Sequence, residues 1–392
     1  MKASEVAKSD IDVFSDDVLE NPYPYYSKLR EQSPVVYLEK NDLWALTRYQ
    51  TIRDALENHE VFSSRKVAFN DQMNQALAGT SLATDPPEHR HLRKTLLAPL
   101  TPRALKGIEE DIKATADELV AELVSRGSFD AIGDLARAFP LKVVSDMIGV
   151  QGAARENILR WGEAAFNVLG PMNQRTIESF PIAGELFQWC LNVKQEDLVE
   201  GSLGHGIFEA SKRGEIAPES CGAIIHQYVA AGMDTTIASI GNAFAQLAAN
   251  PEQYARLVED PQLARAAFNE TLRYEPPVNL FGRLAKTEIE IEGTVIPAGA
   301  QVAVLFAAGN RDPRHYNDPD TYRIDRDPAD HLAFGYGIHT CAGQGLARIE
   351  ALAILTAFAR RVRSFKVGAP QRNLSNMTRG LSSLPVIEVE AL

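Results

Sequence analysis

The chain has 392 residues, of which 45% are hydrophobic and 23% are charged, a balance typical of a globular enzyme and atypical of disordered or fibrous proteins. The formal net charge of −12 disfavours binding to nucleic acid or to an anionic membrane. Residues 1–8 offer no apolar stretch for a signal peptide, and no run of about 18 apolar residues that could span a membrane occurs. Three cysteines are too few for a disulfide framework, so we expect a soluble, cytoplasmic protein without a membrane or nucleic-acid partner.

The first half of the chain is predicted to contain one hairpin followed by helices. Residues 35–48 alternate between apolar and polar types around Asn41-Asp42, which predicts an antiparallel pair of strands. Pro86-Pro87 can open a short helix. Apolar residues then recur at helical spacing over 101–152 and 153–189, so helices should dominate this half.

The region after Pro218 is predicted to form the longest helix. It stays apolar and helical for about thirty residues and ends at Asn250-Pro251. A helix of that length can cross the whole molecule. A further helix over 261–274 should stop before Pro276-Pro277, because proline cannot continue the hydrogen-bond ladder.

Short strands and irregular structure are predicted for the last third of the chain. Strands separated by glycine and proline are expected between 288 and 305. An irregular region, 311–330, precedes a glycine-rich loop, and a last helix should begin just after Cys341. No linker is evident, which favours a single domain, 1–392.

The loop before the last helix surrounds Cys341 with unusual residues. Gly335, Gly337 and Gly343 let the backbone turn tightly and approach a flat group closely. A helix that begins just after a cysteine aims N–H groups at its sulfur, which lowers the thiol pKa and favours a metal-binding thiolate. An isolated cysteine is more often a small core residue, so the neighbouring residues have to decide between the two roles.

The run from Phe334 to Gly343 resembles the haem loop of the cytochrome P450 family, Phe-Gly-x-Gly-x-His/Arg-x-Cys-x-Gly. The resemblance covers essentially the whole chain. It implies a mainly α fold with small β-sheets, shaped as a triangular helical prism. Haem b would lie between the long distal helix and the cysteine-loop helix, with Cys341 as its axial ligand.

The segment Ala231–Thr236 interrupts the apolar character of the long helix. A glycine and a carboxylate are costly inside a buried helix, although a threonine can bond to a carbonyl four residues back and an aspartate can pair with a basic group. The family resemblance implies that this segment crosses the distal face of the haem. Thr235 would then donate a hydrogen bond where oxygen is activated, and Asp234 would relay protons to it.

Two further groups of charged residues take their roles from the resemblance. Four would hold the haem propionates, for which cationic side chains are the natural partners, namely His89, Arg93, Arg283 and His339. Three would form a structural ion-pair network on the proximal side, namely Glu270, Arg273 and Arg326.

The substrate is expected to be a small aromatic molecule. Similarity is highest to bacterial members that oxidise para-substituted benzoates such as 4-methoxybenzoate, and it rests on residues 62–65, 166–171, 281 and 378–385. Where those relatives have an Arg-Ser pair near the substrate carboxylate, this chain has His226-Gln227. A neutral phenol or a larger natural product is therefore an alternative substrate, and a haem-binding sensor or carrier without turnover is an alternative function. The expected pocket residues are Arg65 near the carboxylate and Phe166, Leu169, Gln227, Ala231, Val278 and Phe281 along the walls.

Electrons are expected from an iron–sulfur ferredoxin and a flavin-containing NAD(P)H reductase, as in soluble bacterial members of the family, with O2 as co-substrate. A local basic surface could receive an acidic ferredoxin despite the overall negative charge. Its candidate residues are Arg90, Lys94, Arg103, Lys106 and Arg348.

Overall fold

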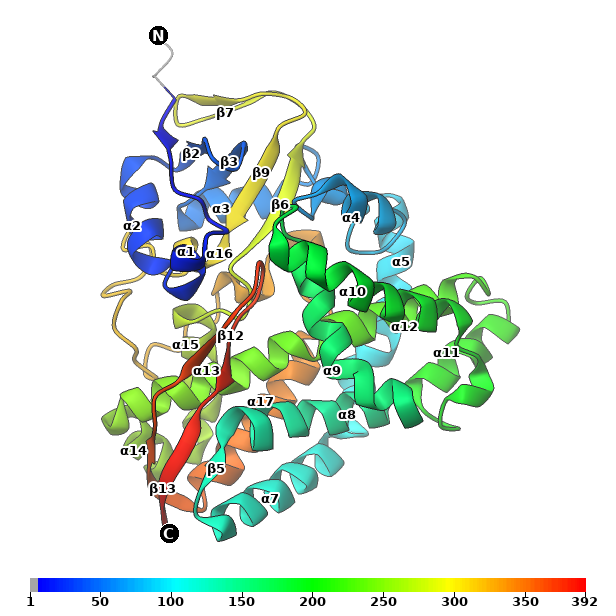
Figure 1. The fold of residues 1–392 in the computed structure, drawn as a ribbon, viewed down its shortest axis with the longest axis vertical. Coiled ribbons are helices and arrows are strands. Elements are labelled where there is room, and N and C mark those ends of the chain that lie inside the picture. Colours follow the sequence, from blue (N-terminus) through cyan, green and yellow to red (C-terminus); the bar gives the residue numbers. More distant parts are fainter. Residues whose placement is uncertain (1–5) are drawn as a thin grey trace.

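The computed structural model describes residues 6–392, so residues 1–5, part of the segment expected to lack a signal peptide, lie outside it. Helices form most of the described chain, and a β-rich region lies at one end of the molecule (Figure 1). This arrangement confirms the prediction of a mainly α fold with small sheets. No helix among residues 6–392 combines the length and the apolar character needed to span a bilayer.

The largest sheet is built from segments that lie far apart in the sequence. Its strands follow the order β1-β2-β3-β9-β6-β4. The predicted hairpin is confirmed, with Val35 opposite Leu46 and Leu38 opposite Leu43. The strands are β1 Lys8–Ser9, β2 Val35–Leu38, β3 Leu43–Leu46, β4 Phe62–Ser63, β6 Leu280–Ala285 and β9 Gln301–Leu305.

Strand β6 was not predicted from the sequence. It begins three residues after Pro276-Pro277 and contains Gly282, so its composition resembles that of a loop. In the fold it pairs antiparallel with β9, while the segment Lys66-Val67 passes close to Gly282. A Cβ at Gly282 would lie 2.4 Å from the carbonyl oxygen of Lys66, so only glycine fits beneath the neighbouring chain. Phe281 and Arg283 flank this position on the same strand.

The helices fill the rest of the molecule, and their apolar faces form a second core next to that of the sheet. They are α1 Asp16–Glu20, α2 Tyr23–Gln32, α3 Tyr49–Glu57, α4 Asp71–Ala76, α5 Glu88–Leu97, α6 Pro102–Lys106, α7 Glu109–Arg126, α8 Ala138–Ile148, α9 Gly152–Asn167, α10 Gln174–Asn192, α11 Leu203–Lys212, α12 Ser220–Gly232, α13 Asp234–Ala249, α14 Pro251–Glu259, α15 Ala264–Tyr274, α16 Phe306–Gly309 and α17 Gln344–Ala359.

The predicted extent of the helical region after Pro218 is confirmed, but the region forms two helices, α12 and α13, that meet at Met233 and are not one continuous helix. Met233 has φ −110° and ψ −61°, within the right-handed helical region but distorted from the usual α-helical values. Next to it, the hydroxyls of Thr235 and Thr236 donate to the carbonyls of Ala231 and Gly232, at 3.1 and 3.2 Å. Such side-chain bonds to carbonyls four residues back compete with the backbone ladder and loosen the helix locally.

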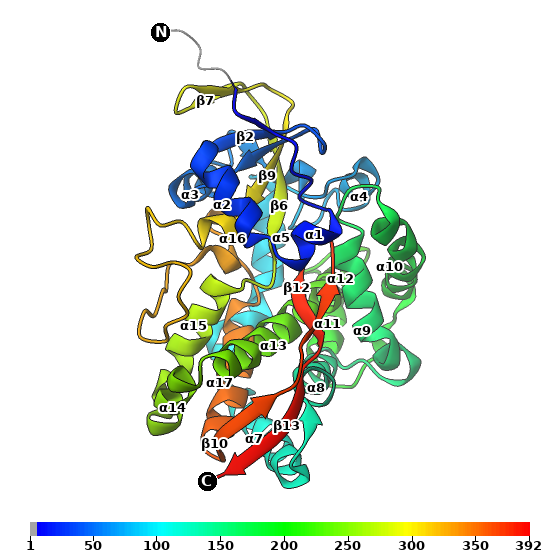
Figure 2. The same cartoon turned by 60° about the vertical axis from the view of Figure 1, so that its left-hand side comes forward.

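The remaining strands lie in small sheets, two of them near the C-terminus (Figure 2). Residues 311–330 contain no helix or strand, and the last helix begins at Gln344, three residues after Cys341, close to the predicted positions. The strands are β5 Phe129–Asp130, β7 Ile289–Ile291, β8 Thr294–Ile296, β10 Val362–Val367, β11 Gln371–Leu374, β12 Arg379–Ser383 and β13 Pro385–Ala391.

Candidate active site

A cavity of about 1240 Å³ separates the cysteine loop from the junction of α12 and α13. Cys341 lines it from the loop before α17, and Thr235 lines it from the start of α13. It opens to solvent beside α10, where Ile177, Phe187 and Leu191 line the cavity and are also exposed. Cys341 and Thr235, which were both predicted to take part in the reaction, therefore line one cavity that a small molecule can reach.

The cysteine loop is held in shape by its glycines and by one backbone hydrogen bond. Gly335 and Gly337 have φ values of 67° and 71°, a region that favours glycine. At Gly337 a Cβ would lie 2.5 Å from the carbonyl oxygen of Leu56, so the loop also needs glycine for its close approach to α3. The backbone N–H of Cys341 donates to the carbonyl of Phe334 at 2.7 Å, which closes the loop.

The surroundings of the Cys341 sulfur raise the pKa of the thiol, whereas the sequence predicted that they would lower it. Cys341 is exposed to the cavity, and its enclosure by the protein raises the pKa of the thiol more than the N–H groups of Gly343 and Gln344 and the Arg93 guanidinium lower it. The predicted helix N–H groups are therefore present but do not favour the thiolate by themselves. A metal cation at the sulfur would supply the missing stabilisation, because a coordinating thiol is deprotonated outright.

Four basic side chains converge on the same cavity from separate elements. Arg93 on α5, Arg283 on β6 and His339 in the cysteine loop line it, and His89 lies against His339 with ring centroids 4.4 Å apart. Burial and neighbouring positive charges lower the pKa of both histidines. Within residues 6–392, none of the four forms an ion pair with a carboxylate.

This basic cluster fits a dianionic cofactor. The Nε2 atoms of His89 and His339 are buried and have no hydrogen-bond partner. Arg283 is 6% exposed, and its guanidinium donates only to the carbonyl of the adjacent Gly282. Unpaired buried charges and donors are costly, so the cluster is best explained by an anionic group that binds there, as the two propionates of haem would.

Asp234 and Thr235 are neighbours in sequence but face different spaces. Thr235 lines the large cavity, whereas Asp234 lines a smaller one of about 240 Å³ together with Arg137, Glu163 and Thr378. Burial raises the pKa of Asp234 to about 6, against a lowering by the Thr378 hydroxyl, and its Oδ2 has no partner. Asp234 can therefore gain and lose a proton near neutral pH, between the small polar pocket and the helix turn that carries Thr235.

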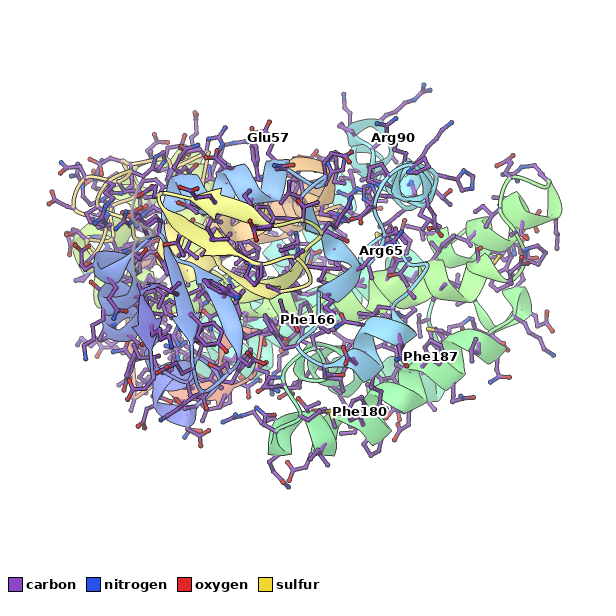
Figure 3. All side chains as sticks on the ribbon, turned by 90° about the horizontal axis from the view of Figure 1, so that it is seen from above. Glu57, Arg65, Arg90, Phe166, Phe180 and Phe187 are labelled. Carbon is purple, nitrogen blue, oxygen red and sulfur yellow. The ribbon has the colours of Figure 1, made fainter. Side chains whose placement is uncertain are left out.

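Most of the predicted substrate residues line the large cavity. Arg65 does not: 70% of its side-chain surface is exposed, and its Nε lies 3.8 Å from the Oδ2 of Asp85 (Figure 3 shows its position relative to Phe166). The predicted residues that do line the cavity are Phe166, Leu169, Gln227, Ala231, Val278 and Phe281.

Sequence reasoning missed two polar groups that line this cavity. Ser81, from the segment between α4 and α5, donates its hydroxyl to the Oε1 of Gln227 at 2.5 Å. Glu350 on α17 is fully buried, which raises its pKa to about 8, and its Oε2 has no partner. An acidic residue inside an apolar helix was a visible signal for Glu350. Ser81 carried no signal, because its partner lies 146 residues away.

The three residues predicted to form a proximal ion-pair network lie in contact with one another. Arg273 donates to both carboxylate oxygens of Glu270 at 2.7 Å, and both side chains are fully buried. Arg326 adds a contact of 3.3 Å from its Nε to Glu270. The network connects α15 to the irregular region before the cysteine loop, consistent with a structural role.

Comparison with known proteins identifies the family. A sequence model of the cytochrome P450 family matches residues 192–386. The chain is 38% identical to cytochrome P450 CYP199A2 of Rhodopseudomonas palustris, over 96% of this chain and 93% of that protein. Among solved structures it is similar to P450BioI in complex with an acyl carrier protein ligated to hexadec-9Z-enoic acid (TM-score 0.86, 27% identity, 96% and 100% of the two chains). It is equally similar to cytochrome P450 CREJ in complex with (4-ethylphenyl) dihydrogen phosphate (TM-score 0.86, 27% identity, 94% and 98% of the two chains). The chain therefore belongs to the cytochrome P450 family and is a monooxygenase that uses haem b.

Proposed function

We propose that this enzyme hydroxylates or O-demethylates a small para-substituted aromatic molecule. The observation that carries the proposal is the composition of the cavity wall beyond Thr235. Phe166 and Phe281 provide flat apolar surfaces in this wall, and Ala231 contributes a small side chain to it. An aromatic ring between these side chains would present one substituent to the region between Thr235 and Cys341.

We propose the haem-holding residues on the basis of the side chains that surround the same cavity. We assign Cys341 as the axial thiolate, with the N–H groups of Gly343 and Gln344 on its sulfur. The propionates would be held by His89, Arg93, Arg283 and His339. The haem, when bound, activates O2 so that one oxygen atom can be inserted into a C–H bond.

Asp234 and Thr235 would manage protons for this reaction. Asp234 exchanges protons with the small pocket that it shares with Arg137 and Glu163. Thr235 keeps its hydroxyl on the carbonyl of Ala231 at 3.1 Å, and release of this bond would turn the Oγ1–H toward the cavity. The pair would thus keep a proton donor at the edge of the large cavity, and Asp234 would supply it with new protons from the small pocket on the opposite side of α13.

We infer that electrons arrive from an acidic iron–sulfur ferredoxin at the basic surface near α5 and α6. Arg90, Lys94, Arg103 and Lys106 are exposed there, as ferredoxin binding requires. Arg348 is less suited, because it is half-buried and donates to the Oδ1 of Asn269 at 2.8 Å.

The test is turnover of the purified holoenzyme with a ferredoxin and its reductase. We expect 4-methoxy-substituted aromatics to yield formaldehyde and the corresponding phenol, with NADH consumed in proportion. The reduced protein should give a carbon monoxide spectrum of the thiolate type, and Cys341→Ser should lose it. Haem binding without product from any aromatic would contradict the proposed function and favour a sensor or carrier.

A further inference from the structure

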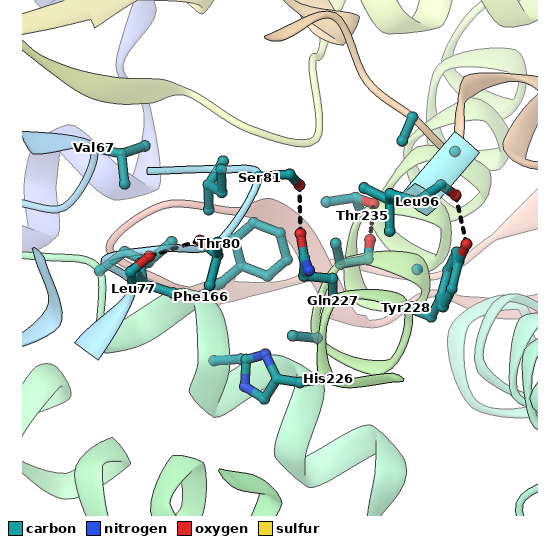
Figure 4. Close-up of a pocket in the computed structure, with 18 of the residues that line it drawn as sticks. Val67, Leu77, Thr80, Ser81, Leu96, Phe166, His226, Gln227, Tyr228 and Thr235 are labelled. Carbon is teal, nitrogen blue, oxygen red and sulfur yellow. Dashed lines mark hydrogen bonds between the residues drawn. The ribbon is translucent and has the colours of Figure 1, made fainter. Parts of the chain in front are cut away.

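A hydrogen-bonded polar pair lies in the largely apolar wall of the large cavity beside α12. Ser81 is 4% exposed, and its Oγ donates to the Oε1 of Gln227 (Figure 4). The Nε2 of Gln227 donates to the carbonyl of Ala223 at 3.1 Å, so the amide orientation is fixed from both ends. The pair joins the segment between α4 and α5 to α12, and both residues line the cavity.

The pair retains unused hydrogen-bonding capacity. The Gln227 amide has two N–H hydrogens and two lone pairs on Oε1, and one of each is used. The Ser81 Oγ can also accept while it donates. The site can therefore give one hydrogen bond and accept at least one, which matches a group that both donates and accepts, such as a hydroxyl or an amide.

The surroundings of the pair carry no positive charge that could neutralise a carboxylate. Among described residues, the arginines that line the cavity are Arg93 and Arg283, which belong to the haem-holding cluster, and no lysine lines it. Burial lowers the pKa of the His226 imidazole, next to Gln227, and so disfavours its positively charged form. A carboxylate placed here would lose its hydration and gain no cation, which is unfavourable.

The position of the pair matches the far end of one aromatic ring. Gln227 on α12 precedes Thr235 on α13 by eight residues across the junction at Met233, and eight residues at the rise of an α-helix span roughly 12 Å. Two hydrogen-bond lengths of about 3 Å each take up part of that distance and leave room for one ring with a substituent at each end. Phe166 lies beside the pair, where it can cover the ring face (Figure 4).

We propose that Ser81 and Gln227 bind the substituent opposite the oxidised group, and that this substituent is neutral, a hydroxyl or a primary amide, not a carboxylate. The inference rests on the proposed function, since it names the substrate class of the same cavity. It departs from the expected preference for benzoates, because Arg65 does not line the cavity and burial disfavours the cationic form of His226.

The experiment measures dissociation constants of the holoenzyme from the spectral shift of the haem, with four matched probes: 4-methoxyphenol, 4-methoxybenzamide, 4-methoxybenzoate and unsubstituted methoxybenzene. The wild type should bind the phenol and the benzamide at least tenfold more tightly than the benzoate. Gln227→Leu should weaken the binding of the phenol and the benzamide roughly tenfold, the usual scale for the loss of a buried hydrogen bond. It should leave the dissociation constant of methoxybenzene unchanged. Gln227→Arg should shift the preference toward the benzoate.

Gln72→Leu is the matched control, because Gln72 on α4 lines the cavity but is exposed and outside the polar pair. It should alter none of the four constants appreciably. Tighter binding of the benzoate by the wild type, or an equal loss for methoxybenzene in Gln227→Leu, would overturn the inference. If methoxybenzene is demethylated but the probes show no preference, the inference fails alone; if none of the four is bound or oxidised, the proposed function fails as well.

Discussion

Arg273 and Arg283 are both buried arginines, but only Arg273 has an acidic partner. Arg273 makes a two-pronged contact with Glu270 and also donates to the carbonyls of Asn310 and Pro319. Arg283 donates only to the carbonyl of its neighbour Gly282, and burial lowers its pKa to about 10. The protein thus completes one buried network by itself and leaves the other incomplete.

The difference separates structural charges from functional ones. Along α15, every buried charge meets an opposite charge or a carbonyl, so this network can hold the fold without a ligand. Around the two cavities, His89, His339, Asp234 and Glu350 each keep a buried atom without a partner among residues 6–392. Because such atoms are costly, they indicate where a cofactor, a proton or water must bind.

The largest effect should come from opening the completed network. Glu270→Gln leaves the buried Arg273 without its carboxylate and should lower the free energy of unfolding by about 3–5 kcal/mol. Urea unfolding followed by circular dichroism measures it. The control is Glu388→Gln, whose pair with Lys366 is exposed and should matter little. Equal effects of the two substitutions would remove the distinction between the two regions.

The proton path should show the next largest effect. Asp234→Asn keeps the size of the side chain but cannot take up and release a proton, so product formation should fall roughly 100-fold. The wild-type rate should also change around pH 6, where burial places the pKa of Asp234, and the variant should lack this change. The measurement is product formed per NADH consumed between pH 5 and 8.

Glu185→Gln serves as the control for that series. Glu185 is an acidic residue on α10 that pairs with Arg160 at the surface and does not line either cavity. It should retain both the rate and the change around pH 6. If Asp234→Asn shows the same change in rate around pH 6 as the wild type, the proton path must use another group.

A smaller effect is expected for the incomplete cluster. Arg283→Met should speed the transfer of haem to apomyoglobin roughly tenfold, because one buried partner of the propionates is lost. The matched control is Arg90→Met, an exposed arginine on α5 outside the cavity. Unchanged haem transfer in Arg283→Met would exclude Arg283 from the haem site.

Local sequence patterns predicted the parts of the site whose residues are adjacent in the chain. The glycines around Cys341 follow from the local sequence, whereas the pair of Glu270 and Arg273 was expected from the family resemblance, and the structure contains both. The hairpin at residues 35–48 follows from alternation in the same way.

Features that depend on distant partners were not predictable. Strand β6 forms because β9 and β4 flank it, and its own composition does not indicate a strand. The break at Met233 depends on hydrogen bonds from the hydroxyls of Thr235 and Thr236 to backbone carbonyls. The sequence does not show how strong these bonds are relative to the backbone hydrogen bonds of the helix. The contact of Ser81 with Gln227 and the separate pocket of Asp234 arise only when the chain is folded.

Glu350 provides the smallest predicted effect, on the pH dependence of stability. Burial raises its pKa from 4.5 to about 8 in the folded protein, so the folded state favours the protonated form. This contribution is fully present below pH 4.5 and is lost as the pH rises through about 8. Glu350→Gln removes that dependence. Relative to the wild type, the variant should therefore gain more than about 1 kcal/mol of unfolding free energy between pH 5 and pH 9.

Urea titrations of the two holoproteins at several pH values measure this difference directly. Glu388→Gln again provides the control, since its exposed carboxylate should shift the curve little. A constant difference between wild type and Glu350→Gln across the range would mean that Glu350 is ionised in the folded protein. The carboxylate would then have a partner, such as water or the bound cofactor, and Glu350 would belong with the completed network and not with the open cavity.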